Sequence, residues 1–335
     1  MRHAALFALV LLIAAPAAAQ PARVAQPAPP DPGPTYVPFD VTIFPPLRVF
    51  HFDRQVVSGL AINALWGTNE GTYGLEIAGL VNYDRVAFGG LQVAGLGSVV
   101  GQAYGIQVGG LFNYASGRCR ALQLSGAFNF CEKGGALQLA GLFNGGGDGF
   151  SGLQVSSMVN YIEWTDFALQ LSLFGNNTVK SFAGVQIGML NFANQTTPVA
   201  VGSCGPNCTT YRTTIYPNAH MHGLQLGCGN FAQNARGVQL GMVVNTATTF
   251  EGLQLGGLGN SATATSGFQL AGLFNAAEDL SGMQVTLGVN YARDVHGVQI
   301  GAINIARRLR GLQIGAINVA YKNTIPVFVG LNAGF

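Results

Sequence analysis

The stretch Gly297-Val-Gln-Ile-Gly-Ala-Ile-Asn-Ile-Ala306 is written again fourteen residues later, as Gly311-Leu-Gln-Ile-Gly-Ala-Ile-Asn-Val-Ala320. The same pattern can be followed back to about residue 57, in steps of 14 to 16 residues except between Gln186 and Gln225. Glu76 takes the place of the central glutamine in an early copy, and Ala61 marks a degenerate first one. A fixed period of this kind indicates a repeat architecture. The central glutamines are Gln92, Gln107, Gln123, Gln138, Gln154, Gln170, Gln186, Gln225, Gln239, Gln254, Gln269, Gln284, Gln299 and Gln313.

Each copy has the alternation of a β-strand. In Gly105-Ile-Gln-Val-Gly-Gly-Leu-Phe-Asn-Tyr114, apolar and aromatic residues mostly alternate with Gln107, Gly109 and Asn113. Period-two alternation is typical of strands, and a helix would have to hold two or three glycines per copy at about 1 kcal/mol each. Short polar pairs such as Arg293-Asp294 separate the copies, as turns do. The sequence therefore predicts an all-β protein.

Two β architectures fit this pattern, and the first is an antiparallel meander closed into an outer-membrane β-barrel of about 16–18 strands. Strands of about ten residues with an apolar outer face and a polar inner face satisfy the backbone inside a bilayer. In this interpretation the glutamines line a lumen, which suits a structural or pore-like role for neutral solutes. The terminal Phe335 resembles the C-terminal aromatic residue of bacterial outer-membrane barrels.

The alternative is a parallel β-solenoid with one coil per repeat, in which the glutamines and asparagines form ladders. Copies such as Gln186 to Ala193 resemble curlin-type repeats, which implies an extracellular role in adhesion or matrix. The distance from Gln to Asn varies between five and six residues, and we expect this variation to interrupt an asparagine ladder.

The cysteines discriminate between the two architectures. Cys119 and Cys131 would lie about 40 Å apart along one straight strand, at roughly 3.3 Å per residue, but in neighbouring coils of a solenoid they could form a disulfide. Cys204 and Cys208 are a second candidate disulfide, which closes a small loop. Cys228 is left over.

The rest of the chain indicates export. Residues 1–20 have the charged start, apolar core and small-residue end of a secretory signal peptide, and residues 21–37 are a Pro-rich, disordered lead-in. Residues 38–335 are expected to form a single repeat-built β domain with a loop insert at 194–222. Charged residues make up only 9% of the chain, which suits a protein that faces lipid or stacks on itself. A net charge of +2 without a basic block argues against nucleic acid as a partner.

The repeats resemble a family of bacterial surface-repeat proteins whose copies contain Gly-Leu-Gln-x-Gly-x-x-Asn. The resemblance covers about residues 57–335, and Ser58 to Gly71 looks like the opening of that family. It implies an exported protein of the bacterial outer membrane or cell surface, and it supplies no catalytic residues.

No catalytic motif is present, so we expect no enzyme activity, no cofactor and no metal. The glutamine row is the one candidate functional set, as a lumen lining or as a ladder. Outer-membrane lipid and the barrel-assembly machinery are the expected partners, and the insert 194–222 could bind a surface partner.

Overall fold

A computed structural model describes residues 35–45, 47–48, 56–193, 197–203, 209–214 and 220–334, and none of these residues is helical. The expected signal peptide, Cys204, Cys208 and Phe335 lie outside the described residues. Strand β1 (Thr35–Phe44) begins inside the range expected for the Pro-rich lead-in. The all-β fold class is confirmed.

The strands follow one another along the whole described chain. Besides β1, the first half contains β2 (Leu47–Arg48), β3 (Val56–Asn63), β4 (Trp66–Ala78), β5 (Val81–Ala94), β6 (Gly97–Val100), β7 (Ala103–Gly109), β8 (Phe112–Ser125), β9 (Phe128–Ala140), β10 (Phe143–Asp148), β11 (Phe150–Ser156), β12 (Val159–Trp164) and β13 (Ala168–Ser172). The second half contains β14 (Gly175–Thr178), β15 (Phe182–Ile187), β16 (Leu190–Ala193), β17 (Thr197–Ser203), β18 (Thr209–Thr214), β19 (Met221–Gly256), β20 (Gly259–Ala271), β21 (Phe274–Thr286), β22 (Val289–Ile300), β23 (Ile303–Ala320) and β24 (Val327–Gly334).

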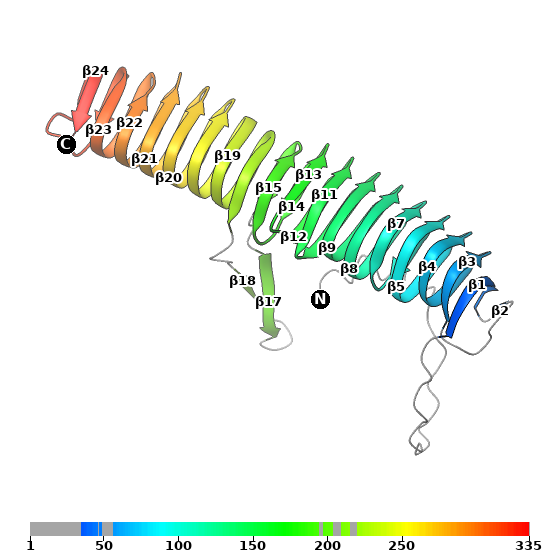
Figure 1. Cartoon of the computed structure of the whole chain (residues 1–335). Helices are drawn as coiled ribbons and strands as arrows, with labels where there is room; N and C mark the ends of the chain where they lie inside the picture. Colours follow the sequence, from blue (N-terminus) through cyan, green and yellow to red (C-terminus); the bar gives the residue numbers. More distant parts are fainter. Residues whose placement is uncertain are drawn as a thin grey trace. The chain divides into compact units, whose positions relative to one another are not determined.

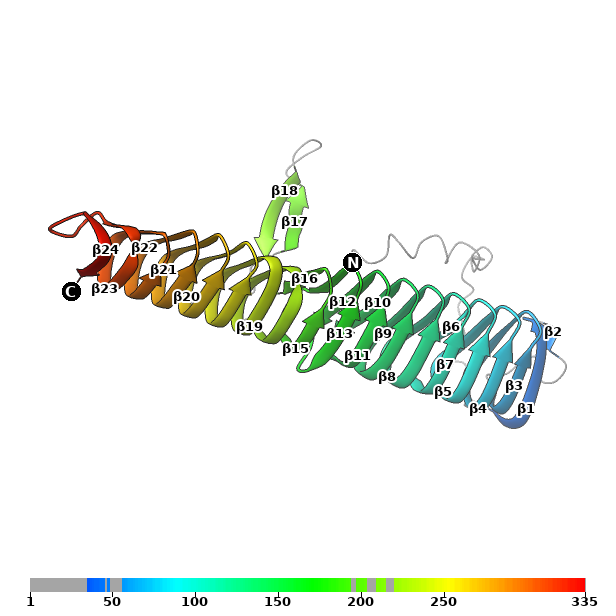
Figure 2. The ribbon, with the colours of Figure 1, turned by 90° about the horizontal axis from the view of Figure 1, so that it is seen from above.

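The repeats stack as the parallel coils of a β-solenoid (Figures 1 and 2). Gln154 lies in register with Gln138 on one side and with Gln170 on the other, and both pairings are parallel. Asn144 lies in the same way between Asn129 and Asn160. An antiparallel meander would reverse direction at each repeat. The expected closed barrel of 16–18 strands is therefore wrong, and the alternative is the observed fold.

A corner inside each repeat explains the difference. In the copy around Gln107, residues Gln107, Gly109 and Asn113 face inward, but Gly110 and Leu111 both face outward. Leu111 is 51% exposed, although continuing the alternation from Gln107 along one straight strand would place it on the inner face of a barrel. Two consecutive outward residues fold the predicted single strand into two short ones, which we call the Gln strand and the Asn strand. Each coil is closed by these two strands and two corners.

The same corner accommodates the variation in Gln-to-Asn distance. Asn304 follows Gln299 after five residues, yet it lies in register with Asn290. It accepts a hydrogen bond from Asn290 and donates one to Asn318. In these copies the corner is one residue shorter, and the inward-facing residues of the two strands still point inward. The expectation that this variation would interrupt an asparagine ladder is wrong.

Glycine allows the coils to approach closely at the corner. A Cβ on Gly110 would lie 1.9 Å from the carbonyl oxygen of Gly95 in the preceding coil. Gly297, which opens the repeat quoted first, adopts a φ of 147°, a conformation that other residues rarely adopt. Gly110 and Gly297 therefore have a backbone role in their own coils, while some other copies hold alanine, serine, leucine or methionine at the equivalent positions.

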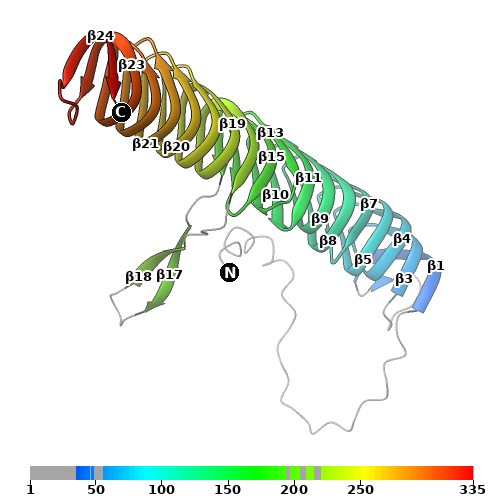
Figure 3. The same cartoon turned by 60° about the vertical axis from the view of Figure 1, so that its left-hand side comes forward.

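The interior of the coils combines amide layers with an apolar row. The apolar row lies near the second corner, where each Asn strand leads into the next Gln strand, and it includes Phe88, Phe150, Phe182, Phe250 and Leu280, all buried. At the C-terminal end of the coils, β24 pairs antiparallel with β23 (Figure 3). This reversal ends the parallel stacking within the described residues.

Candidate functional site

The glutamines form one hydrogen-bonded ladder through the coils. Each Nε2 donates to the Oε1 of the preceding glutamine, as from Gln254 to Gln239 at 2.7 Å and from Gln269 to Gln254 at 2.6 Å. The ladder crosses the insert, because Gln225 donates to Gln186 at 2.8 Å. All fourteen glutamines are fully buried. The structure thus brings together the whole set that the sequence singled out, as a ladder and with no exposed lumen lining.

A second ladder of asparagines runs beside the first with the opposite polarity. Asn290 donates through Nδ2 to Oδ1 of Asn304, and Asn304 donates to Asn318, each at 2.8 Å. Donation therefore runs toward the C-terminus among the asparagines and toward the N-terminus among the glutamines. Most Nδ2 atoms also reach a backbone carbonyl of the next coil, as from Asn304 to Ile314 at 2.8 Å. From Asn129 onward the amides are therefore satisfied on both sides, whereas Oδ1 of Asn113 has no partner because Ser98 replaces the asparagine of the preceding coil.

The glutamine ladder ends at a pair of buried carboxyl groups. Gln92 donates through Nε2 to Glu76 at 2.7 Å and to Asp84 at 2.9 Å. Asn63 and Asn69 donate to the other oxygen of Glu76, at 3.0 and 3.3 Å. Ala61, which is in register with Glu76, offers no side-chain acceptor. A carboxylate suits this end of the ladder because it accepts hydrogen bonds and donates none.

Burial changes the protonation of this pair. Burial raises the pKa of Glu76. Burial, together with the nearby charge of Glu76, raises the pKa of Asp84 well above its usual range. The two carboxyl groups are also hydrogen-bonded to each other. Two buried carboxylates that accept from the same amide disfavour double ionisation, so we expect the pair to hold a proton at pH values where free carboxyl groups have lost theirs.

The cysteines lie as the solenoid interpretation predicts. Cys119 on β8 and Cys131 on β9 form a disulfide with a Cα–Cα distance of 6.1 Å, and both side chains are fully buried. Cys228 is a free, half-buried thiol. The predicted pairing of Cys204 with Cys208 falls outside the described residues.

The insert interrupts one corner only. It leaves the coils after Ala193 and returns at Met221, and β17 and β18 within it pair antiparallel with each other. His220 and His222 lie where the insert returns, with ring centroids 5.8 Å apart. Among the described residues, no group of three or more His, Cys, Asp or Glu side chains is arranged to hold a metal ion.

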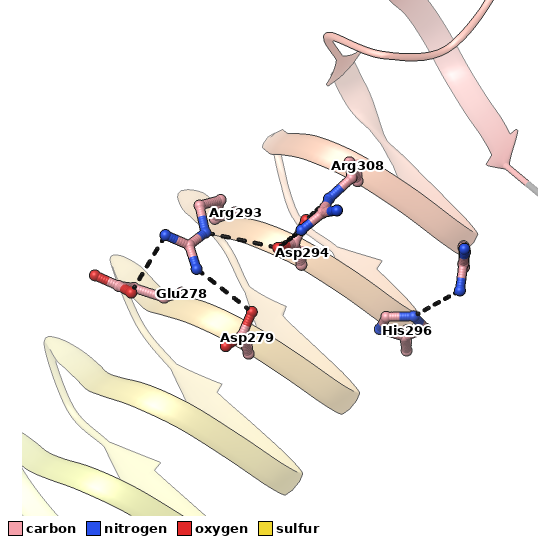
Figure 4. A network of polar contacts seen from close by, with 7 residues as sticks. Glu278, Asp279, Arg293, Asp294, His296 and Arg308 are labelled. Carbon is pink, nitrogen blue, oxygen red and sulfur yellow. Dashed lines mark hydrogen bonds and ion pairs between the residues drawn. The ribbon is translucent and has the colours of Figure 1, made fainter.

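Charged side chains gather at the corner between each Asn strand and the next Gln strand, which we call the charged edge. Arg293 lies 3.6 Å from Glu278 and 3.6 Å from Asp294, and Arg308 of the next coil also binds Asp294 (Figure 4). The hydrogen bond from Arg308 lowers the pKa of Asp294. The pairs Arg236–Glu251 and Lys180–Glu163 repeat the arrangement in earlier coils. Exposed pairs of this kind contribute little stability each. Because their charges remain hydrated, this edge of the coils faces water.

Apolar side chains occupy the opposite corner, at the third or fourth position after most of the glutamines, and we call this corner the apolar edge. Its members are well exposed: Leu111 is 51%, Leu258 46% and Leu273 59% exposed. From Glu76 to Gln313, no copy has a charged residue in the first seven positions after the glutamine position. The apolar edge includes Leu65, Leu80, Leu96, Leu111, Leu142, Met158, Leu173, Phe174, Met189, Met242, Val243, Leu258, Leu273, Leu287 and Ile317.

Sequence reasoning missed the apolar edge and the carboxyl pair. A signal for the edge is present in the sequence, because Gly-Leu stands at these positions after Glu76, Gln92, Gln107, Gln138, Gln254 and Gln269. Continuing the alternation of one straight strand places that leucine in the interior. Asp84 stands eight residues after Glu76, a spacing that has meaning only once the corner is known.

No family model, no curated protein and no solved structure matches this chain. In the described part of the chain, no helix is long and apolar enough to cross a membrane.

Proposed function

We propose that this protein is an exported, non-catalytic surface protein of a bacterium, whose β-solenoid acts in adhesion or matrix formation. The observation that carries the proposal is the filled interior: the glutamines and asparagines are buried and bonded to one another. The pore-like role rested on glutamines that line an open lumen, and they do not do so. The outside of the coils is what such a protein offers to other molecules.

Three further observations support this assignment. The disulfide between Cys119 and Cys131 suits an oxidising compartment outside the cytoplasm. Residues 1–20 have the pattern of a secretory signal peptide. The repeats resemble those of bacterial surface-repeat proteins. The barrel-assembly machinery was expected as a partner of a closed barrel, and the coiled fold removes that reason.

The insert at 194–222 is the proposed contact for a surface partner. It projects from the charged edge of a regular stack, and its removal leaves the ladder intact, since Gln225 already bonds directly to Gln186. Deleting residues 195–218 shortens the spacing of these glutamines from 39 to the 15 residues found between Gln254 and Gln239. The deletion variant therefore isolates the role of the insert.

The test is expression of the full chain in a bacterium, followed by fractionation and protease treatment of intact cells. We expect the protein to be exported, cleaved near residue 20 and accessible to protease, and we expect expressing cells to adhere to one another or to a surface. The deletion variant should be exported equally but adhere less. A chain retained in the cytoplasm with residues 1–20 intact would contradict the proposal.

A further inference from the structure

The apolar edge has the composition of a surface that contacts hydrocarbon. Its side chains are 38 to 85% exposed, and they run without a charged residue from coil to coil. Soluble proteins rarely expose one contiguous apolar patch on this scale unless it binds something.

The backbone at this edge is paired as a membrane requires. The amide of Leu111 donates to the carbonyl of Leu96 at 2.7 Å, and that of Leu273 donates to Leu258 at 2.9 Å. The neighbouring glycine amides are paired too, as from Gly110 to Ala94 at 3.1 Å. An unpaired N–H or C=O is costly in hydrocarbon, and these corners leave the coil-to-coil amides paired. The edge can therefore leave water without breaking a backbone hydrogen bond.

The apolar surface continues from the edge onto both strands of the coil. Ile77 and Ile106 on the Gln strands are 42 and 41% exposed, and Trp66 and Tyr83 on the Asn strands are 39 and 40% exposed. A second copy of the chain would have to be complementary in shape to the edge and to both flanks. A lipid leaflet that receives the edge covers the edge and both flanks together, and Trp and Tyr beside it match the preference of these residues for membrane interfaces.

Side-chain shape varies along the edge while its apolar character does not. Equivalent positions hold Leu142, Met158, Phe174, Val243 and Leu258. A protein partner requires shape complementarity at the centre of its interface, whereas fluid acyl chains adapt to any apolar shape. A shallow hollow of about 720 Å³, lined by Leu124, Leu139, Val155 and Leu173 among others, adjoins the edge and offers room for a chain.

From the apolar edge, its paired backbone and the segregation of charge, we infer that this β-solenoid binds a lipid membrane by inserting its apolar edge into one leaflet, with the charged edge in water. The insert lies on the charged edge, so the same orientation presents it away from the lipid. Hydrocarbon contact rather than charge attraction holds the protein there. This binding does not depend on the adhesive role proposed above.

The test uses the purified full mature chain and flotation with vesicles of neutral phosphatidylcholine. Leu258→Lys combined with Leu273→Lys places two charges on the apolar edge. Ser266→Lys combined with Ser281→Lys places the same two charges on exposed serines of the charged edge, at most one coil away. Circular dichroism and thermal unfolding of each variant establish that both pairs remain folded.

We expect the wild-type chain and the serine variant to float with the vesicles, also in 1 M salt, and the leucine variant to lose at least tenfold in vesicle affinity. Flotation only with anionic vesicles and its loss in salt would overturn the inference, because charge attraction would then be the cause. A wild-type chain that stays with the soluble fraction as a dimer would also overturn it and assign the edge to a second copy.

Discussion

The Nε2 atom of Gln92 donates to the carboxylate of Glu76 across 2.7 Å, so a ladder of amides that both donate and accept ends on a group that only accepts. Glu76 is tolerated because Ala61 in the preceding coil has nothing to receive a hydrogen bond. Elsewhere each glutamine must donate onward, and a glutamate in its place would leave an acceptor of the preceding coil unsatisfied.

We therefore expect Gln254→Glu to be strongly destabilising at pH 7. The new carboxylate could not donate to Oε1 of Gln239 and would bury a charge, and losses of about 3 kcal/mol are typical when such a network is broken. Denaturant unfolding measures the loss. Ser266→Glu adds the same charge at the exposed edge and should change stability by less than about 0.5 kcal/mol. Equal effects of the two substitutions would contradict the role of the ladder.

The carboxyl pair predicts that stability falls as pH rises above the ordinary carboxyl range. The pKa of Asp84 and that of Glu76 are raised in the folded chain, so the folded state binds more protons than the unfolded state between the ordinary and the raised pKa values. Under this condition the free energy of unfolding decreases with increasing pH. Thermal unfolding between pH 4 and pH 8 should show the decrease.

Asp84→Asn resembles the protonated carboxyl group and should remove much of this dependence. At pH 8 the variant should be more stable than the wild type, because the amide carries no charge to bury beside Glu76. Hydrogen exchange in β4 and β5 should slow accordingly. A variant less stable than the wild type at pH 8 would show that the pair is stable in its ionised form.

The disulfide should stabilise the coils around β8 and β9. Because it closes a loop with a sequence separation of 12, reduction or Cys119→Ser with Cys131→Ser should cost about 3 kcal/mol. Cys228→Ser is the matched control, because that thiol is free. If the double substitution left the unfolding midpoint unchanged, the bond would have no role in stability.

Gly110 at the apolar corner should be sensitive to substitution, because it touches the preceding coil. Gly110→Ala would place its Cβ 1.9 Å from a backbone oxygen and force the coils apart. We expect a loss of about 2 kcal/mol or more, as for other overpacked sites. In Gly135→Ala the nearest atom lies at 3.8 Å, so this control should retain wild-type stability. Thermal unfolding compares the two.

How much of this could be predicted from the sequence depends on what periodicity encodes. The period, the all-β class and the glutamine set follow from spacing alone, whereas the Cys119–Cys131 pairing follows only for the solenoid alternative. The relative direction of successive strands does not follow from spacing, because a repeat that alternates between inside and outside fits an antiparallel meander and a parallel coil equally well. The decisive fact, that Gly110 and Leu111 both face outward, depends on contacts between copies and not on the order of residues within one copy.

The candidate site was predictable to a smaller degree. The fourteen glutamines were identified, but whether they line a lumen or bond to one another is a question of three-dimensional closure. Asp84 could not be selected because its partner Glu76 lies on the other strand of the coil, and only the corner brings the two together.

The regular repetition of the two amide ladders has a consequence for how such a chain can lengthen. A coil that carries both the glutamine and the asparagine offers its two neighbours the same donors and acceptors as the next such coil does. Duplicating it therefore leaves the amide pairing at each junction unchanged. The two ends are different, because Glu76 only accepts and Asn332 donates to Gln313 without continuing the repeat. Gene duplication can therefore change the number of coils freely between fixed ends, and the reach of the protein can evolve while its stability per coil stays constant.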